Sequence, residues 1–147
     1  MIMVDFAHNP DGLLQILSTI PYPNSGAKKI LVFGCEGGKD QGKRKLMGEI
    51  AAIHSDYCII STDNVYREDP LEIAKEVEEG VLGGGMDISQ YQIILDRHGA
   101  IQTALKLADP GDVVIIAGKG HETSQILHDK VIPFNDCEVV KKLLHTL

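Results

Sequence analysis

The chain has 147 residues, of which 44% are hydrophobic, 24% charged and 5% aromatic, and its formal net charge at pH 7 is −7. This size and apolar content are typical of one globular domain with its own core. Acidic residues are spread along the chain, which argues against a broad nucleic-acid footprint, although Lys39, Lys43, Arg44 and Lys45 form a small basic cluster.

Strand-like segments alternate with helical patterns along the chain. Runs rich in Ile and Val indicate strands at 2–6, 30–33, 57–60, 91–95 and 113–117. Continuous apolar runs of this kind are typical of parallel strands that are covered on both faces. The alternation therefore predicts an α/β fold: a Rossmann-like, doubly wound, mostly parallel sheet of about six strands with helices on both faces.

The expected helices carry local start signals. Asn9 is a suitable N-cap and Pro10 fits the first helical position. Asp69, Pro70 and Glu72 repeat this signal with an acidic residue in the first turn. Apolar residues three and four apart give each helix one buried face. In chain order these faces are Leu13, Leu14, Leu17 and Ile20; Leu46, Met47, Ile50 and Ala51; Leu71, Ala74, Val77 and Val81; Ile101, Ala104, Leu105 and Ala108; and Val139, Val140, Leu143 and Leu144.

The last part of the chain departs from simple alternation. The run "SQILHDKVIPF" at 124–134 predicts a short hairpin, and Asn135 or Asp136 is expected to cap a final helix. No internal repeat or long linker is present, so we expect residues 1–147 to form a single domain. The chain enters its first strand with no lead-in, and we therefore expect it to be part of a longer protein.

The segment "GCEGGKDQGKR" at 34–44 resembles a phosphate-binding loop, because Gly37 is followed four residues later by Gly42 and Lys43. It also lies between a predicted strand and a predicted helix, as such loops do. However, Arg44 stands where a Ser or Thr would bind Mg²⁺, and Glu36 and Asp40 would place carboxylates beside the phosphates. We therefore interpret this segment as something other than a nucleotide-binding loop.

Polar segments follow four of the five predicted strands: "DFAHNPD", "GCEGGKDQGKR", "STDNVYRED" and "GKGHE". In a doubly wound sheet the carboxyl ends of the parallel strands meet at one edge, where ligands bind. These four segments are therefore expected to form one continuous polar rim.

Each polar segment also has an ordinary structural interpretation. Asp5, His8 and Asn9 fit a helix cap with a solvated histidine, and Asp63 with Asn64 fits a plain turn. The segment 118–122 favours binding, since a tight turn does not need Lys, His and Glu between glycines. Here Glu122 suits an ammonium group, Lys39 suits a carboxylate, and the N–H groups of the glycines suit a carboxylate or phosphate.

Other classes of site find little support in the sequence. The three cysteines are far apart with no C-x-x-C pair, and the histidines have no metal-ligand spacing, so we assign neither a disulfide framework nor a metal. No Ser lies in a G-x-S-x-G motif. No signal peptide or membrane-length apolar run is present, and the expected location is the cytoplasm, with no membrane or nucleic-acid partner.

Five segments taken in order resemble a known family: "VDFAHNPDGL", "VFGCEGGKDQGKRKLMGEIA", "STDNVYREDP", "PGDVVIIAGKGHE" and the following "QIL". The resemblance is to the carboxy-terminal domain of the Mur ligases, nearest to the E-type members, and it covers essentially the whole chain. It implies an ATP-dependent ligase of peptidoglycan precursor synthesis that forms an amide between a carboxylate and an amino acid. It also implies that ATP and Mg²⁺ are bound mainly by a central domain that this chain lacks.

The resemblance further implies partners and residue roles. The substrates would be a UDP-N-acetylmuramoyl-peptide and a free amino acid, and this domain would close over ATP against the protein's own N-terminal and central domains. No catalytic residue is expected within this domain alone, so in isolation it would be inactive. The implied ATP-proximal residues are Asp5, His8, Asn9 and Lys39. The implied amino-acid-binding residues are Lys39, Asp63, Asn64, Tyr66, Arg67, Gly118 and Glu122.

Two departures from the family pattern leave the amino acid open. Diaminopimelate-adding members usually have Asp-Asn-Pro-Arg, whereas here Asp63 and Asn64 are followed by Val65, Tyr66 and then Arg67. In addition, Lys39 stands in place of a family Arg and lacks its planar fork. Diaminopimelate and a lysine-like amino acid are therefore both open. The alternative functions are a non-catalytic module that binds an amino acid or nucleotide, or the same domain from a folylpolyglutamate- or cyanophycin-type ligase.

Overall fold

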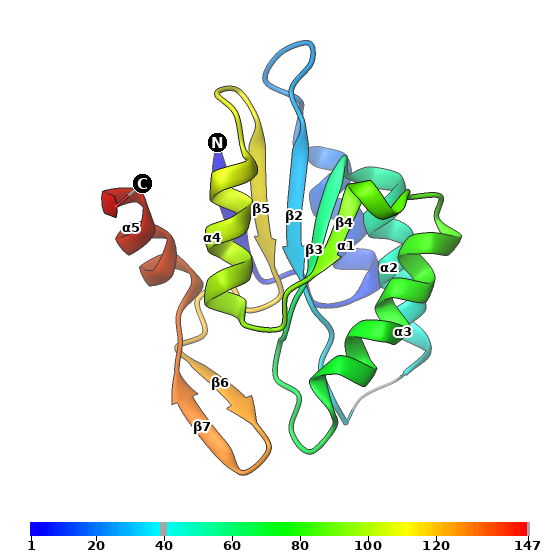
Figure 1. Cartoon of the computed structure of the whole chain (residues 1–147), viewed down its shortest axis with the longest axis vertical. Coiled ribbons are helices and arrows are strands. Elements are labelled where there is room, and N and C mark those ends of the chain that lie inside the picture. Colours follow the sequence, from blue (N-terminus) through cyan, green and yellow to red (C-terminus); the bar gives the residue numbers. More distant parts are fainter. Residues whose placement is uncertain (39–40, 147) are drawn as a thin grey trace.

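The computed structural model describes residues 1–38 and 41–146 and has an open parallel sheet at its centre. The strands of this sheet are β1 (Ile2–Asp5), β2 (Lys29–Phe33), β3 (Tyr57–Ile60), β4 (Tyr91–Ile93) and β5 (Val113–Ala117). Their order is β1-β5-β2-β3-β4, and every neighbouring pair is parallel. The arrowheads of β2 and β5 point to the same end of the molecule in Figure 1. The predicted doubly wound α/β fold is therefore confirmed.

The five α-helices cover both faces of the sheet (Figure 1). They are α1 (Pro10–Thr19), α2 (Gly42–His54), α3 (Pro70–Gly83), α4 (Arg97–Leu107) and α5 (Asp136–Thr146), and a short 3₁₀ helix, η1 (Ile88–Gln90), precedes β4. Side chains of α1, α2 and α3 pack in one apolar cluster with one face of the sheet. Side chains of α4 and α5 pack in a second cluster on the opposite face. Because β2 and β5 lie between the two clusters, all of their residues are buried.

The caps predicted from sequence are present. The Asn9 side chain accepts a hydrogen bond from the Gly12 N–H and caps α1, and the Asp69 side chain does the same for the Leu71 N–H at the start of α3. For the last helix, Asn135 rather than Asp136 accepts from the Glu138 N–H. Asp136 is buried instead, because it pairs with a guanidinium inside the protein.

Most of the predicted buried helix faces are confirmed, but the prediction is wrong at their margins. Leu14, Leu46, Leu71 and Leu144 were expected inside and are exposed. On α3, Ile73 is also buried, although the predicted face omits it. Periodicity alone sets a helix face only to within about one position, because the apolar stripe of a helix is roughly 100° wide.

The predicted hairpin forms β6 (Ser124–Leu127) and β7 (Lys130–Pro133), which pair with each other in antiparallel register. They make a separate two-stranded sheet, so the central sheet has five strands rather than about six. The hairpin joins the rest of the domain through the loop after β3, since the Val65 N–H donates to the Ile126 carbonyl. Figure 1 shows it at the end of the molecule to which the strands point.

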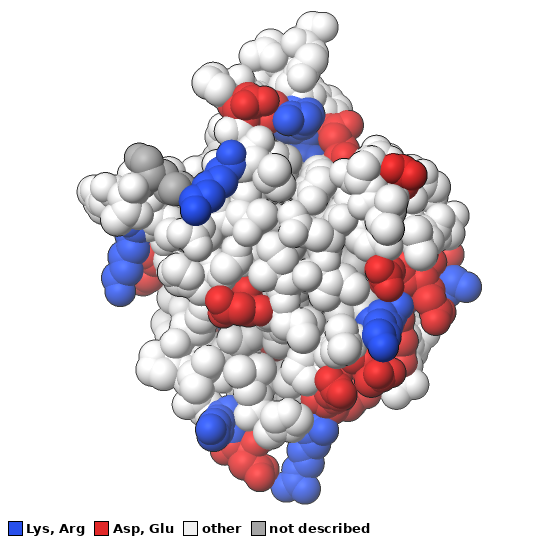
Figure 2. Space-filling view, viewed as in Figure 1, with Lys and Arg blue, Asp and Glu red and all other residues white. Residues whose placement is uncertain are grey.

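Charged side chains of both signs are interspersed on the face shown in Figure 2, with many of the acidic ones over α3. This follows from the sequence of α3, which carries four glutamates and one lysine. In the described part of the chain, no helix is long and apolar enough to cross a membrane.

Candidate functional site

The four polar segments identified in the sequence lie at one edge of the sheet, because the strands that precede them are all parallel. Neighbouring segments are in direct contact. The Gly118 N–H after β5 donates to the Asp5 carbonyl at the end of β1. A Cβ on Gly34 would lie 2.4 Å from the Ser61 carbonyl oxygen, so the segments after β2 and β3 also pack tightly. In the described residues, the polar segments after β1 and β5 are thus in contact, and so are those after β2 and β3.

The segment that resembles a phosphate-binding loop is occupied by groups of the protein itself. The Gly37 N–H donates to the Asn64 carbonyl, and the Gly38 N–H donates to the Glu68 carboxylate. In a phosphate loop, these backbone N–H groups would bind phosphate oxygens. A carboxylate beside them repels an anion, so the described part of this segment does not fit a polyphosphate.

Arg44, which replaces the expected Ser or Thr, holds this segment to the next loop. Its guanidinium is buried and donates to Glu68 at 2.6 Å, to Glu76 at 2.9 Å and to the Glu36 carbonyl at 3.2 Å. Arg44 is therefore not part of an exposed basic patch, in contrast to the cluster suggested by sequence. Of that cluster, Lys43 and Lys45 are exposed and Lys39 lies outside the described residues.

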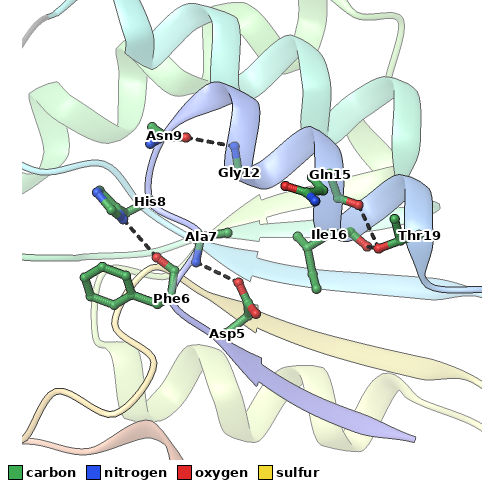
Figure 3. A pocket seen from close by; sticks show the side chains of 9 residues that line it. All are labelled: Asp5, Phe6, Ala7, His8, Asn9, Gly12, Gln15, Ile16 and Thr19. Carbon is green, nitrogen blue, oxygen red and sulfur yellow. Dashed lines mark hydrogen bonds between the residues drawn. The ribbon is translucent and has the colours of Figure 1, made fainter.

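The loop between β1 and α1 borders a cavity of about 410 Å³ (Figure 3). Asp5 is at the end of β1, and its carboxylate accepts from the Ala7 N–H at 2.8 Å. Asn9 serves as the helix cap, as its ordinary interpretation predicted, whereas His8 is exposed at the mouth of the loop. The other wall is formed by the α1 side chains Gln15, Ile16 and Thr19.

An exposed aromatic side chain in the same loop was not identified from sequence. Phe6 has its ring centroid 4.6 Å from that of His8 and 6.0 Å from that of His121. The backbone at Gly120 approaches Phe6 so closely that a Cβ there would lie 2.9 Å from the Phe6 Cβ. An aromatic residue directly before the polar residues that follow the first strand was the available signal. The three rings form a solvent-facing aromatic surface next to the cavity.

Behind the rim, the loops after β3 and β5 bury a polar cluster. Asp63 and Asn64 are both buried, and Lys119 is 0% exposed. The Lys119 ammonium donates to Asn64 Oδ1 at 3.1 Å and to Glu122 Oε1 at 3.4 Å, and lies 3.9 Å from Asp63 Oδ1. Glu122 is partly open to solvent, with a side-chain exposure of 34%. Asp63, Asn64 and Glu122, which the sequence singled out separately, are thus brought together by Lys119.

Arg97 forms the floor of this cluster. Its guanidinium makes a bidentate pair with Asp136, at 2.8 and 2.7 Å, and donates to the Thr62 and Ala117 carbonyls. Both side chains of the pair are fully buried. Arg97 therefore ties the ends of β3 and β5 to the start of α5, which fixes the loops that carry the rim residues.

The electrostatics of the cluster follow from its burial. Burial raises the pKa of the Asp63 carboxyl above its ordinary value, while the positive charges of Arg97 and Lys119 oppose that rise. Glu122 adds a further negative charge that also raises this pKa. The cluster thus concentrates acidic groups and their two cationic partners at the edge of the sheet.

Gly118 must be a glycine in this arrangement. Its φ is +119°, and a Cβ would lie 2.6 Å from Asp63 Oδ2. Gly118, which was predicted to belong to the site, therefore contributes no side chain. Its lack of a Cβ lets the loop after β5 approach Asp63 closely.

Two other predicted site residues lie at the border of the cluster or outside it. Tyr66 has a φ of +54°, which is uncommon for a bulky residue, and it forms an isolated bridge with Leu127 of the hairpin. The Arg67 side chain is 88% exposed and lies 3.7 Å from Asp129 in the hairpin turn. The structure does not bring Arg67 into the polar cluster.

The described residues contain no group of three or more His, Cys, Asp or Glu side chains arranged to hold a metal ion. Cys35 and Cys58 are buried, and burial raises the pKa of each thiol to about 12. Their sulfur atoms lie close to those of Met47 and Met86, respectively, so both cysteines belong to the core.

Sequence reasoning missed Arg97, Asp136 and Gln125 as members of the site, and it considered Lys119 only as part of the segment 118–122. Arg97 did carry a signal: a cation at the start of a helix is unfavourable beside the helix dipole, which indicates a specific partner elsewhere. Lys119 lies between two glycines with positive φ. Gln125 donates from its amide to the Thr62 and Asp63 carbonyls and carried no comparable signal in the sequence.

Comparisons with known proteins agree on one family. A family model described as "Mur ligase, glutamate ligase domain" matches residues 1–120. UDP-N-acetylmuramoyl-L-alanyl-D-glutamate–2,6-diaminopimelate ligase of Caldanaerobacter subterraneus subsp. tengcongensis is 46% identical over 143 residues, which is 97% of this chain and 29% of the relative. The protein of that name from Syntrophomonas wolfei is 47% identical over 144 residues, again 97% of this chain and 29% of the relative.

Solved structures show the same relationship. A structure titled as a UDP-N-acetylmuramoyl-L-alanyl-D-glutamate–2,6-diaminopimelate ligase is 36% identical and has a TM-score of 0.88, covering 99% of this chain and 29% of that one. A domain from a Haemophilus ducreyi ligase, at 15% identity and a TM-score of 0.59, shares the fold and is covered over 89% of its length. The chain thus spans less than a third of the curated relatives named above.

Proposed function

The chain belongs to the Mur ligase family, whose glutamate ligase domain it carries, and from this premise we propose that it is the amino-acid-binding, closing domain of an ATP-dependent ligase of peptidoglycan precursor synthesis. The complete protein would join a free amino acid to a UDP-N-acetylmuramoyl-peptide by an amide bond. The two curated relatives described above are both named as diaminopimelate ligases, which supports this assignment.

The observation that carries the proposal is the grouping of Asp63, Asn64, Gly118 and Glu122 at one edge of the sheet. These residues come from two loops more than fifty positions apart, and three of them contribute side chains that suit the polar groups of an amino acid. Glu122, which is partly exposed, would accept hydrogen bonds from an ammonium group. Asn64 would donate from its amide to a carboxylate.

The ATP side of the proposed site is the cavity beside the loop after β1, with Asp5, His8 and Asn9 in its wall. Lys39, proposed to meet the amino acid and the reacting phosphate, lies outside the described residues. The described part of the neighbouring loop does not fit a polyphosphate, since Glu68 already accepts from the Gly38 N–H. We therefore assign the main binding of ATP and Mg²⁺ to a central domain outside this chain.

We propose a diamino acid as the incoming substrate class, because the negative charge of Glu122 suits a second ammonium group. The distal carboxylate is the point on which diaminopimelate and lysine differ. Arg67 lies at the surface, 3.7 Å from Asp129, whereas the Asn64 amide lies in the polar cluster and would donate to that carboxylate. Tyr66 occupies the position of the family arginine and lies beside the polar cluster, where it bridges to Leu127.

The test is a steady-state assay of the complete protein with ATP, a UDP-N-acetylmuramoyl-peptide, and either diaminopimelate, lysine or norleucine. Norleucine matches lysine in length but lacks the second ammonium. We expect one of the two diamino acids to be the best substrate. Replacing Glu122→Gln should raise its KM about tenfold to a hundredfold, because one charge-assisted hydrogen bond is lost. The KM for ATP should change little.

Glu72→Gln is a matched control, since Glu72 is exposed on α3 and pairs only loosely with Lys75 at 3.9 Å. It should leave all three amino acids unaffected. Equal use of norleucine and the diamino acids by the wild-type protein would contradict the proposed site. Robust ATP turnover by residues 1–147 alone would contradict the assignment of the nucleotide site to another domain.

A further inference from the structure

We propose that Lys119 is a positioning residue for amino-acid recognition: its buried ammonium fixes the orientation of Asn64 and Glu122, so that these two side chains present an amide donor and a carboxylate oxygen to the substrate. This inference rests on the proposed function and extends it to a residue that would not touch the substrate. Lys119 is completely buried, whereas Glu122 is the member of the pair that reaches solvent.

The orientation of the Asn64 amide follows from its partners. Its Oδ1 lies 3.1 Å from the Lys119 ammonium and 2.9 Å from the Ile126 N–H. Both partners can only donate, so the oxygen and not the nitrogen of the amide must face them. The NH₂ group is thereby directed away from Lys119, and it has no hydrogen-bond partner among the described residues. Lys119 thus leaves Asn64 with a donor free for a ligand acceptor.

Glu122 is held through the same ammonium. The Lys119 ammonium lies 3.4 Å from Glu122 Oε1, and the Glu122 N–H donates to the Lys119 carbonyl. The Glu122 carbonyl in turn accepts from the Asn135 side chain at 3.0 Å. The backbone and one carboxylate oxygen are therefore fixed, while the second oxygen, Oε2, has no partner in the described part of the chain. A cation arriving from solvent would meet that second oxygen.

The balance of charge leaves room for such a cation. The acidic groups of the cluster are Asp63, Glu122 and Asp136, and the basic groups are Lys119 and Arg97. Arg97 is paired with Asp136, and Lys119 lies between the other two carboxylates. One negative charge therefore remains, and Glu122, the exposed member, is where it can be matched by a substrate ammonium.

The cost of burying Lys119 argues for a specific role. Removing an ammonium from water is expensive, and an apolar side chain in a buried position is often at least as stable as an ion pair. The glycines on both sides, Gly118 and Gly120, have φ values of +119° and +55° and form the tight turn that carries Lys119. We therefore interpret the buried Lys119 ammonium as a group that fixes the positions of the rim residues, and not as part of the packing of the core.

The experiment compares Lys119→Met and Lys119→Gln in the complete protein, using the same assay with the preferred diamino acid and norleucine. Methionine removes the donor, whereas glutamine keeps an amide N–H donor on a side chain that is one bond shorter. We expect the preference for the diamino acid over norleucine to be about tenfold smaller in the Met variant than in the wild type. This change corresponds to the loss of one oriented hydrogen bond. We expect the Gln variant to retain part of that preference. Lys141→Met, at an exposed position on α5, is the matched control and should retain all of it.

A double-mutant cycle separates positioning from general destabilisation. If Lys119 acts through Glu122, the effect of Lys119→Met on substrate preference should be much smaller in a Glu122→Gln background. A Met variant that folds and keeps the wild-type preference would overturn the proposal. So would a loss of kcat that is equal for both amino acids, or failure of both Lys119 variants to fold, since these outcomes make Lys119 a residue of stability alone.

The two proposals fail in different ways. If Glu122→Gln leaves the preference unchanged, the amino-acid site itself is wrong and the proposed function falls with it. If Glu122→Gln removes the preference but Lys119→Met and Lys119→Gln do not, only the role of Lys119 is wrong.

Discussion

At the scale of single residues, buried charges determine the geometry of the rim. Arg97 and Asp136 are both fully buried and bonded through two N–H groups of the guanidinium. A pair of this kind contributes little compared with apolar packing, but breaking it leaves an uncompensated charge inside the protein. Its structural effect is to join three elements, since Arg97 also donates to the carbonyls of Thr62 and Ala117.

We therefore predict that Asp136→Asn lowers the free energy of unfolding by about 3–5 kcal/mol. Glu138→Gln, two residues later on the exposed side of α5, should change it by less than about 0.5 kcal/mol. Both values are measured by urea denaturation of the 147-residue chain, followed by circular dichroism. A change below 1 kcal/mol for Asp136→Asn would mean that the pair is not formed as described.

At the scale of elements, the helix that follows β2 is held to the loop before α3 by one arginine. Arg44 on α2 pairs with Glu68 in that loop and with Glu76 on α3. Hydrogen bonds from the guanidinium, and then from the Gly38 N–H, lower the pKa of the Glu68 carboxyl below its ordinary value. A carboxylate of the protein thus accepts from a backbone N–H group that would bind phosphate in a phosphate-binding loop.

This arrangement predicts a pH-dependent contribution to stability. A carboxyl whose pKa is lower in the folded state stabilises the fold fully above its unfolded pKa, and this contribution disappears as the pH falls through the folded value. Glu68→Gln should therefore destabilise the chain by roughly 1 kcal/mol at pH 7, and the difference from wild type should shrink as the pH falls below about 4. Urea titrations from pH 7 to pH 3 measure the difference. A difference that stays constant over this range would contradict the described pairing.

The hairpin is a second element whose position depends on few contacts. β6 and β7 form their own two-stranded sheet, and β6 is joined to the loop after β3 through Asn64, Val65, Tyr66 and Gln125. We predict that Gln125→Leu increases hydrogen exchange at the Val65 and Ile126 amides by at least about tenfold, because two bonds to loop carbonyls are lost. The Ile115 amide in the central sheet should be unaffected. Equal acceleration at all three amides would indicate global destabilisation instead.

At the scale of the whole molecule, the two apolar clusters enclose the central sheet and exclude solvent from it. The burial of the three cysteines differs, so their reactivity can be used to measure how well the clusters exclude solvent. Cys35 and Cys58 are buried and Cys137 is half-buried. Because burial raises the pKa of the Cys35 and Cys58 thiols to about 12, little thiolate is available at either position near neutral pH.

We predict that a thiol reagent such as DTNB modifies Cys137 much faster than the other two cysteines at pH 8. All three should react at once in guanidinium chloride. Mass spectrometry of the modified chain identifies the sites, and the slow phase in native buffer should follow global unfolding. Rapid modification of Cys35 in the folded chain would show that the cluster between α2 and the sheet is open to solvent.

Local chemistry was enough to predict much of this protein. The strands at 30–33, 57–60 and 113–117 follow from their apolar runs, and the starts of α1 and α3 follow from Asn9 and Asp69. Because parallel strands end at one edge, the sequence also determined that its polar segments would share a rim, and its five motifs identified the family.

Tertiary structure decided which side chains meet within that rim. Arg44 finds Glu68 and Glu76 at separations of 24 and 32 positions, and Lys119 finds Asn64 at a separation of 55. Such pairings depend on how the loops are placed in space, so neither helical nor strand periodicity contains them. The predicted buried helix faces differ from the observed ones at their margins for the same reason. Whether a residue beside the apolar stripe is buried depends on its neighbours in space. The sequence alone determined where polar chemistry gathers, and only packing determined which charges are buried and which face solvent, because burial depends on every element packed around a group.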